Sequence, residues 1–351
     1  MKNGIITIEH TDEFRQFDEI IDVRSPSEFA EDHVPGAINR PVLSDEQRIE
    51  VGTIYKQHSP FAAKRIGAAY VAENIAHHLV HSFDNRPKNW RPLIMCWRGG
   101  QRSGAMTLIL RKIGWDATQL HGGYKEYRKL VVDELSAIPR LLSFKVICGP
   151  TGSGKSRVLQ ALAEQGQQVL DLEEIACHKG SVLGVLPNAR QPSQKMFETR
   201  LLEALHRFDP ARPVYVEAES RKIGTIHLPD ALIETMRAGS CVIIDASFET
   251  RISFLLGDYD YFIAAPEWLN SRLNELRKLQ SREAIERWKD YVKNAQWSEL
   301  VRELLEQHYD PLYRQSQNRN FSGMSTSTTL TSDDLSPSGI NALANRISSS
   351  D

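Results

Sequence analysis

The sequence has few cysteines, almost no net charge and no long apolar segment. Its four cysteines are widely spaced and none forms a CxxC pair, which disfavours a zinc site; they are Cys96, Cys148, Cys177 and Cys241. The formal net charge is −2, so a nucleic-acid site would have to be a local patch. No apolar run approaches the ~18 residues that cross a bilayer, and no signal peptide is recognisable. We therefore expect a cytoplasmic protein with reduced thiols and no membrane span.

The remaining composition is ordinary, and the length suggests more than one domain. Hydrophobic residues make up 41% of the chain and charged residues 25%, which is typical of globular proteins. A chain of 351 residues has room for two domains. Two segments that carry chemistry lie apart in the sequence, one in each of the two predicted domains.

The first of these segments, FKVICGPTGSGKS at 144–156, matches the phosphate-binding pattern GxxxxGK[ST] between an apolar strand and a helix. Glycines let successive backbone N–H groups turn inward towards an anion, and the helix adds its positive N-terminal end. The lysine supplies a charge for the terminal phosphate, and the serine hydroxyl can bind Mg²⁺. The predicted phosphate-binding residues are Gly149, Thr151, Gly152, Ser153, Gly154, Lys155 and Ser156.

The second segment surrounds Cys96, which ends the apolar run PLIM and precedes WRGGQRS and a helical pattern. Backbone N–H groups and a helix N-terminus would there point at the sulfur and stabilise a thiolate. Arg98 and Arg102 add positive charge. We expect a nucleophilic thiolate, or a persulfide or perselenide carried on it. Asp22 and Arg24, at the end of an earlier strand, are expected to form a structural pair.

Acidic residues follow three predicted strands of the second domain, on the side where the phosphate loop lies. One of them should orient Mg²⁺, directly or through water. Asp245 fits that pattern best and Asp171 competes with it. The complete set of candidates is Asp171, Glu173, Glu217, Glu219 and Asp245. Polar loops offer further candidates for substrate binding, namely Arg190, Arg221 and Lys222.

Two helical segments are candidates for contact with RNA. The segment 51–76 carries His58, Lys64 and Arg65, and the segment 272–293 mixes basic residues with Trp288 and Tyr291. For both, an ordinary solvated helix face is the favoured interpretation.

The motifs IDVRSPSEF, HVPGAIN, the loop from Cys96 to Arg102, and LHGGY resemble a rhodanese domain. That resemblance implies a parallel α/β sheet and a chalcogen carried on Cys96. Five residues separate Cys96 from Arg102, whereas rhodaneses that carry sulfur typically have four. Five is the spacing of related phosphatases, and a wider loop would fit a phosphate or a larger chalcogen.

The predicted fold class is α/β: a rhodanese-like parallel-sheet domain, then a P-loop NTPase-like α/β domain with a helical C-terminal part. We expect the first domain at 1–132, with a helical insertion at about 51–80, and a linker at 133–143. The second domain should span 144–320. The Ser/Thr-rich tail at 321–351 should have little fixed structure.

Over almost its whole length the sequence resembles the bacterial tRNA 2-selenouridine synthases. The shared landmarks are GTIYKQHSPFAAKRIGA, CWRGGQRS, GPTGSGKS, LDLEE, HKGS and VEAESRKIG. The resemblance implies replacement of sulfur by selenium in wobble 2-thiouridine of tRNAs for Lys, Glu and Gln. It also implies selenophosphate as selenium donor, geranyl diphosphate as co-substrate and an S-geranylated intermediate. The enzyme that makes selenophosphate is a candidate partner, and no tightly bound organic cofactor is expected.

The chemistry expected of the two loops is consistent with this resemblance. The phosphate loop would hold the diphosphate leaving group with Mg²⁺, and Cys96 would hold or position selenium while Arg98 and Arg102 bind the donor's phosphate. Two other classes stay open. One is an ATP-dependent tRNA sulfurtransferase, and the other is a phosphatase with Cys96 as phosphate acceptor, fused to a nucleotide-binding domain.

Overall fold

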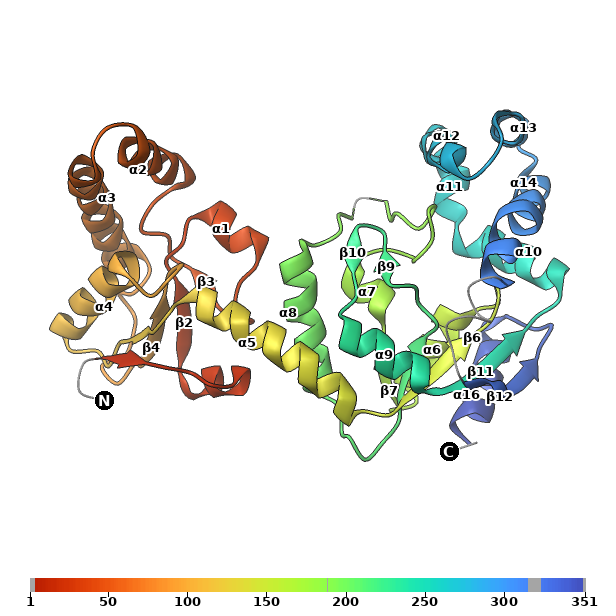
Figure 1. The fold of residues 1–351 in the computed structure, drawn as a ribbon, viewed down its shortest axis with the longest axis horizontal. Coiled ribbons are helices and arrows are strands. Elements are labelled where there is room, and N and C mark those ends of the chain that lie inside the picture. Colours follow the sequence, from red (N-terminus) through yellow and green to blue (C-terminus); the bar gives the residue numbers. More distant parts are fainter. Residues whose placement is uncertain (1–3, 188, 315–322, 350–351) are drawn as a thin grey trace. The chain divides into compact units, whose positions relative to one another are not determined.

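The computed structural model describes residues 4–187, 189–314 and 323–349. The chain divides into two units, each α/β with a parallel sheet, as the sequence predicts (Figure 1). One unit comprises Met1–Glu134 with Ser193–Glu203, and the other comprises Leu135–Pro192 with Ala204–Asp351. Among the described residues, no helix is both long and apolar enough to cross a membrane.

The first unit is built on a five-stranded parallel sheet in the order β1-β5-β4-β2-β3. Its middle strand β4 is buried along its whole length, as expected for a parallel strand covered on both faces. The strands are β1 (Ile5–Ile6), β2 (Glu19–Asp22), β3 (Ile38–Asn39), β4 (Pro92–Met95) and β5 (Thr118–Leu120). The helices are η1 (Thr11–Gln16), α1 (Pro26–Glu31), α2 (Asp45–Gln57), α3 (Pro60–His81), α4 (Gln101–Ile113) and α5 (Tyr124–Ala137).

Helices α2 and α3 form the insertion that the sequence predicts at about 51–80, although α2 begins earlier. Serine side chains cap both helices: Ser44 accepts a hydrogen bond from the backbone of Gln47, and Ser59 accepts from Phe61. Pro60 occupies the first turn of α3, where its missing N–H costs nothing. The two helices therefore begin at positions encoded locally in the sequence.

The second unit is built on a five-stranded parallel sheet in the order β12-β11-β6-β8-β7. The strands are β6 (Phe144–Cys148), β7 (Gln168–Leu170), β8 (Val214–Glu217), β11 (Ser240–Asp245) and β12 (Gly323–Thr331), with a small antiparallel pair β9 (Lys222–Ile223) and β10 (Ile226–His227). The helices of this unit are η2 (Ile138–Leu141), α6 (Lys155–Glu164), α7 (Leu172–Ala176), α9 (Asp230–Ala238) and α16 (Pro337–Ser348), whereas nearly all of α8 (Gln194–Leu205) belongs to the first unit.

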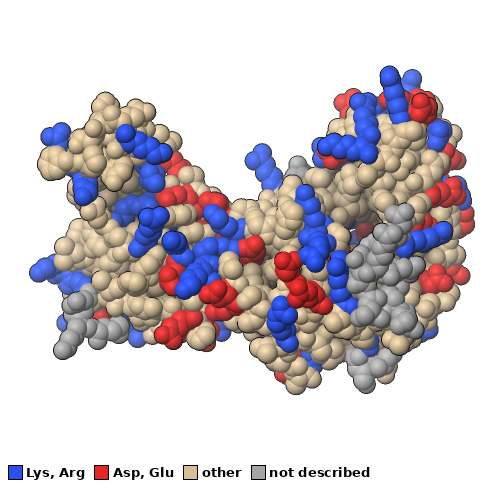
Figure 2. All heavy atoms as spheres, in the orientation of Figure 1, with Lys and Arg blue, Asp and Glu red and all other residues tan. Residues whose placement is uncertain are grey.

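A helical part follows β11, as predicted, and it begins at Phe248. It comprises α10 (Phe248–Asp258), α11 (Asp260–Ala264), α12 (Pro266–Leu273), η3 (Asn274–Lys278), α13 (Arg282–Lys293), α14 (Trp297–Leu304) and η4 (Leu305–Tyr309). Trp288 is fully buried in the core of these helices, so it cannot stack on RNA bases. Tyr291 donates a hydrogen bond to Glu303. On the face drawn in Figure 2, basic and acidic side chains are mixed over α12 and α13, as on a solvated helix face.

The prediction that 321–351 has little fixed structure is wrong for the described residues. The strand β12 extends the sheet beside β11, and α16 packs against α6. The apolar residues of this tail, Leu330, Ile340, Leu343 and Ile347, are buried in the same cluster as Val158 and Leu162 of α6. The tail completes the core beneath the phosphate loop.

The residues predicted as a linker at 133–143 are mostly helical, because α5 runs to Ala137 and η2 follows it directly. The segment Ser193–Glu203, predicted in the second domain, belongs to the first unit. There the Tyr127 hydroxyl donates to Thr199 at 3.2 Å, and Arg128 pairs with Glu198.

Candidate functional site

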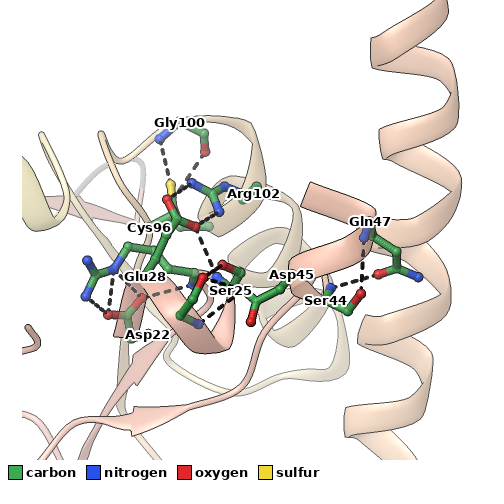
Figure 3. Close-up of polar contacts among 12 residues, drawn as sticks. Asp22, Ser25, Glu28, Ser44, Asp45, Gln47, Cys96, Gly100 and Arg102 are labelled. Atoms are coloured by element: carbon green, nitrogen blue, oxygen red, sulfur yellow. Dashed lines mark hydrogen bonds and ion pairs between the residues drawn. The ribbon is translucent and has the colours of Figure 1, made fainter. Parts of the chain in front are cut away.

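Cys96 directly follows β4, and its side chain is buried at the carboxyl edge of the first sheet, with 3% of the residue exposed. Its sulfur accepts hydrogen bonds from the backbone N–H of Gly100 at 3.3 Å and from the hydroxyl of Ser103 at 3.2 Å (Figure 3). Both donors belong to the start of α4, so the helix N-terminus faces the sulfur. This arrangement, a cradle of donors around the thiol, stabilises negative charge on it.

The loop from Cys96 to Gly100 is held against the turn that follows β5. The backbone N–H of Tyr124 donates to the carbonyl of Cys96 at 2.8 Å, and the Gln119 amide donates to the carbonyl of Gly100 at 3.1 Å. Gly123 has φ +61°, and a Cβ atom there would overlap the carbonyl of Cys96. The glycines of the motif LHGGY therefore permit a backbone-to-backbone contact that fixes the cradle.

Arg102 lies beside the cradle and forms an ion pair of 2.7 Å with Glu28 of α1 (Figure 3). Burial alone would raise the pKa of Glu28, but the hydrogen bond and charge of Arg102 outweigh it and hold the pKa below its usual value. Arg98 is exposed, so only one of the two predicted arginines lies at the cradle. Asp22 and Arg24 form a buried pair of 2.6 Å, which confirms their predicted structural role.

A cavity adjoins the cradle and is bounded by α2, α3 and α4. Gln101 and Arg102 contribute to it from the cradle side. Its floor is made of small and apolar residues, and exposed cations stand along it, namely Arg48, Lys56 and Lys64. In the face drawn in Figure 2, Lys and Arg side chains lie over α2 and α3. Arg65 and His58 are also exposed but do not line this cavity.

The phosphate loop of the second unit has the conformation that its glycines predict. Gly149, Gly152 and Gly154 have φ of +150°, +83° and +79°, values that residues with a side chain rarely adopt. A Cβ on Gly149 would lie 2.6 Å from the carbonyl of Ile244. Ser153 is fully buried, and its hydroxyl has no hydrogen-bond partner among the described residues. The loop and the N-terminus of α6 together form an anion-binding cradle, in which the Ser153 hydroxyl is available as a donor.

Three of the predicted acids meet beside this loop. Carboxylate oxygens of Glu173, Glu217 and Glu219 lie within 4.8 Å of one another, and the hydroxyl of Ser156 is 3.5 Å from Glu173. Burial, reinforced by the neighbouring carboxylates, raises the pKa of Glu173 to about 10 and that of Glu219 to about 7. Burial likewise raises the pKa of Glu217. Such crowding of hard oxygen donors suits a divalent cation.

The other two acids lie outside this cluster. Asp171 caps α7, where its carboxylate accepts from the backbone of Glu174 at 2.8 Å. Asp245 is exposed at the end of β11, and its carbonyl accepts from the backbone of Ser332. The sequence favoured Asp245, but the structure instead brings together acids from β8, α7 and the loop after β8.

The remaining predicted substrate residues lie at the surface. Arg221 pairs with Asp230, while Arg190 and Lys222 are exposed. The loop HKGS, a landmark of the resemblance for which the sequence indicates no specific role, lies against the acids: a Cβ on Gly180 would lie 2.6 Å from Glu173. Lys179 of this loop donates to the Asp258 carboxylate at 2.7 Å. The dense polar composition HKGS is the signal that could have identified it.

A second cavity adjoins the phosphate pocket. It is almost entirely apolar and is enclosed by α10, α11, α12 and α14. The two cavities share the lining residues Thr151, Ser181, Leu255 and Tyr259. The phosphate loop therefore faces a polar pocket that continues into an apolar one.

Comparison with known proteins finds a matching family for each of the two units. Residues 9–130 match the rhodanese-like domain family, and residues 142–265 match the family described as tRNA 2-selenouridine synthase AAA domain. The tRNA 2-selenouridine synthase of Alcanivorax borkumensis is 34% identical over 323 residues, covering 84% of this chain and 88% of that protein. The enzyme of the same name from Nitrosomonas europaea is 36% identical, covering 68% of this chain and 63% of that protein. The one from Shewanella halifaxensis is 30% identical, covering 84% and 87%.

Proposed function

The chain belongs to the tRNA 2-selenouridine synthase family, and from that premise we propose that it replaces the sulfur of wobble 2-thiouridine by selenium through an S-geranylated intermediate. It is a tRNA-modifying transferase. The proposed acceptors are tRNAs for Lys, Glu and Gln. The observation that carries the proposal is the presence of two chemically complete sites in one chain, a thiol cradle and a phosphate loop with an acidic cluster.

The phosphate loop is proposed to hold geranyl diphosphate. The sulfur of 2-thiouridine attacks the first carbon of the geranyl group, the C–O bond breaks, and its electron pair leaves with diphosphate. Lys155, the first residue of α6, offers a donor for the charge that develops there, and so does the hydroxyl of Ser153, which has no hydrogen-bond partner within the described part of the chain. The nucleobase loses its N3 proton, which leaves a base alkylated on sulfur.

The acidic cluster fits Mg²⁺ on the chemistry of its donors. Glu173, Glu217 and Glu219, with the hydroxyl of Ser156 beside them, supply oxygen atoms close enough to share one ion. A bound Mg²⁺ would neutralise negative charge on the diphosphate. Burial raises the pKa of all three acids, so the cluster keeps protons that a bound Mg²⁺ would displace.

The cradle of the first unit is proposed to carry out the second half-reaction. Alkylation makes C2 of the base electrophilic. Selenium from selenophosphate forms a bond to C2, the C–S bond breaks, geranylthiol leaves, and the P–Se bond is hydrolysed to phosphate. We propose that Cys96 holds or positions the selenium. In this proposal the donor's phosphate replaces the Glu28 carboxylate as the ion-pair partner of Arg102. Arg98, which is exposed, adds a second positive charge for that phosphate.

The cavity beside the cradle supports an approach of tRNA from the side of α2 and α3. Arg48, Lys56 and Lys64 offer positive charge for the RNA backbone there. The apolar floor between these helices ends at Arg102, so a base carrying an apolar substituent would be compatible with that path.

The proposal is tested by separating the two half-reactions with two variants. Cys96→Ser should still geranylate 2-thiouridine tRNA but lose formation of 2-selenouridine. Lys155→Ala should lose geranylation but still convert tRNA that was geranylated beforehand. Lys278→Ala, a change at an exposed lysine that lines none of the described cavities, is the control. Equal loss of both activities in both variants, measured by nucleoside mass spectrometry, would argue against this division.

A further inference from the structure

We propose that the apolar cavity of the second unit binds the isoprenoid chain of the diphosphate substrate; the inference rests on the proposed geranyl transfer. Thr151 and Leu255 belong to both the apolar cavity and the phosphate pocket, as do Ser181 and Tyr259. A molecule whose phosphates lie against the loop therefore passes directly into the apolar cavity. The continuity of the two cavities fixes the direction in which the substrate chain extends.

The lining of the cavity matches a hydrocarbon and not a nucleoside. Beyond the shared residues, its walls are formed by leucine, isoleucine and aromatic side chains, including Leu183, Leu256, Phe262, Leu269 and Leu300. The hydroxyl of Tyr309, a polar group at the wall, is already hydrogen-bonded to Ser181 and to the backbone of Leu183. A purine placed there would lose the hydrogen bonds that its donors and acceptors make with water, whereas a prenyl chain has no such hydrogen bonds to lose.

Buried leucines form one wall of the cavity and limit the space that a chain can occupy. Leu300, Leu304 and Leu305 are 2%, 6% and 0% exposed and separate the cavity from the interior of the helical part. Val301 and Leu256 also line it but are only half-buried. A longer side chain at either of these two positions would shorten the space without disturbing the core.

Two substitutions that narrow the cavity test the inference. Val301→Phe and Leu256→Phe should each raise the KM for geranyl diphosphate about tenfold or more, since both displace part of the chain. The inhibition constant of inorganic diphosphate, which touches only the phosphate pocket, should not change. Leu279→Phe is the matched control, because Leu279 is 56% exposed and does not line the cavity. An unchanged KM in both cavity variants would overturn the inference.

Binding to the unaltered protein gives an independent test that needs no substitution. Affinity should rise on the order of a hundredfold from dimethylallyl to geranyl diphosphate, because five more carbons are buried. It should stop rising at farnesyl diphosphate. Equal affinities for inorganic diphosphate and geranyl diphosphate would overturn the inference even if geranyl transfer occurs. Chain-dependent binding without any transfer to tRNA would instead support the cavity assignment and contradict the proposed reaction.

Discussion

Arg251 of α10 is predicted to stabilise the second unit and to fix the phosphate loop. Its guanidinium donates to the carbonyl of Thr151 at 2.8 Å and makes two hydrogen bonds, of 2.6 and 3.0 Å, to the carboxylate of Asp310. The two side chains are 5% and 14% exposed. Arg251→Ala would leave Asp310 buried without its cation and the carbonyl of Thr151 without its donor. Breaking a buried pair in this way costs about 3–5 kcal/mol of unfolding free energy.

The expected consequence is a large fall in melting temperature. For a unit of roughly 200 residues, each kcal/mol corresponds to about 2–4 °C, so Arg251→Ala should melt about 6–20 °C below the unaltered protein. Arg302→Ala is the matched control. Arg302 lies over the ring of Phe248, as Arg251 does, but its pair with Glu249 is exposed, at 41% and 71%. An exposed pair contributes at most about 1 kcal/mol.

Differential scanning calorimetry of the two variants measures this difference. Arg251→Lys, which keeps the charge but not the forked donors, should fall between them. Arg251→Ala should also raise the KM for geranyl diphosphate, since Thr151 lines the phosphate pocket. Equal melting temperatures for Arg251→Ala and Arg302→Ala would refute the reasoning.

Three further predictions follow from the same geometry. In metal-free protein, the free energy of unfolding should fall as pH rises from about 5 to above 7. The reason is that Glu173 and Glu219 keep their protons in the folded protein, whereas the unfolded chain loses them near pKa 4.5. Thermal melts with EDTA that show no dependence on pH would contradict this. Gly180→Ala should slow geranylation, because Gly180 has φ +63° and the new Cβ would collide with the Glu173 carboxylate. Conversion of geranylated tRNA should stay normal, and nucleoside mass spectrometry measures both reactions. Asp22→Ala should cost about 3–5 kcal/mol in denaturant unfolding by leaving the buried Arg24 without a paired carboxylate, and a cost below 1 kcal/mol would exclude that role.

The two reactive loops could be predicted from the sequence because each is encoded locally. The chain from Gly149 to Ser156 contains every group that the phosphate loop uses, and the same holds for Cys96 with its flanking glycines. The acids that join the phosphate loop could not be predicted in the same way. Each predicted strand ends in a carboxylate, and only the strand order decides which ones meet: β8 and β7 lie on one side of β6, and β11 lies on the other.

The tail shows a different limit. Its Ser- and Thr-rich composition suggested little fixed structure, yet β-branched threonines suit an edge strand beside β11. Ile340, Leu343 and Ile347 follow the spacing of an amphipathic helix and mark α16 in the sequence, but the surrounding polar residues obscured the pattern. The position of Trp288 depended on packing between α12, α13 and α14, which no local pattern reveals.

Nucleoside mass spectrometry of 2-thiouridine tRNA incubated with the purified protein and Mg²⁺ tests the central claim most directly. With geranyl diphosphate alone, the account predicts S-geranyl-2-thiouridine, and with selenophosphate added it predicts 2-selenouridine. A parallel incubation contains ATP and a sulfur donor. Modification only in that incubation, with no change in the presence of geranyl diphosphate, would contradict the account and point to an ATP-dependent sulfurtransferase.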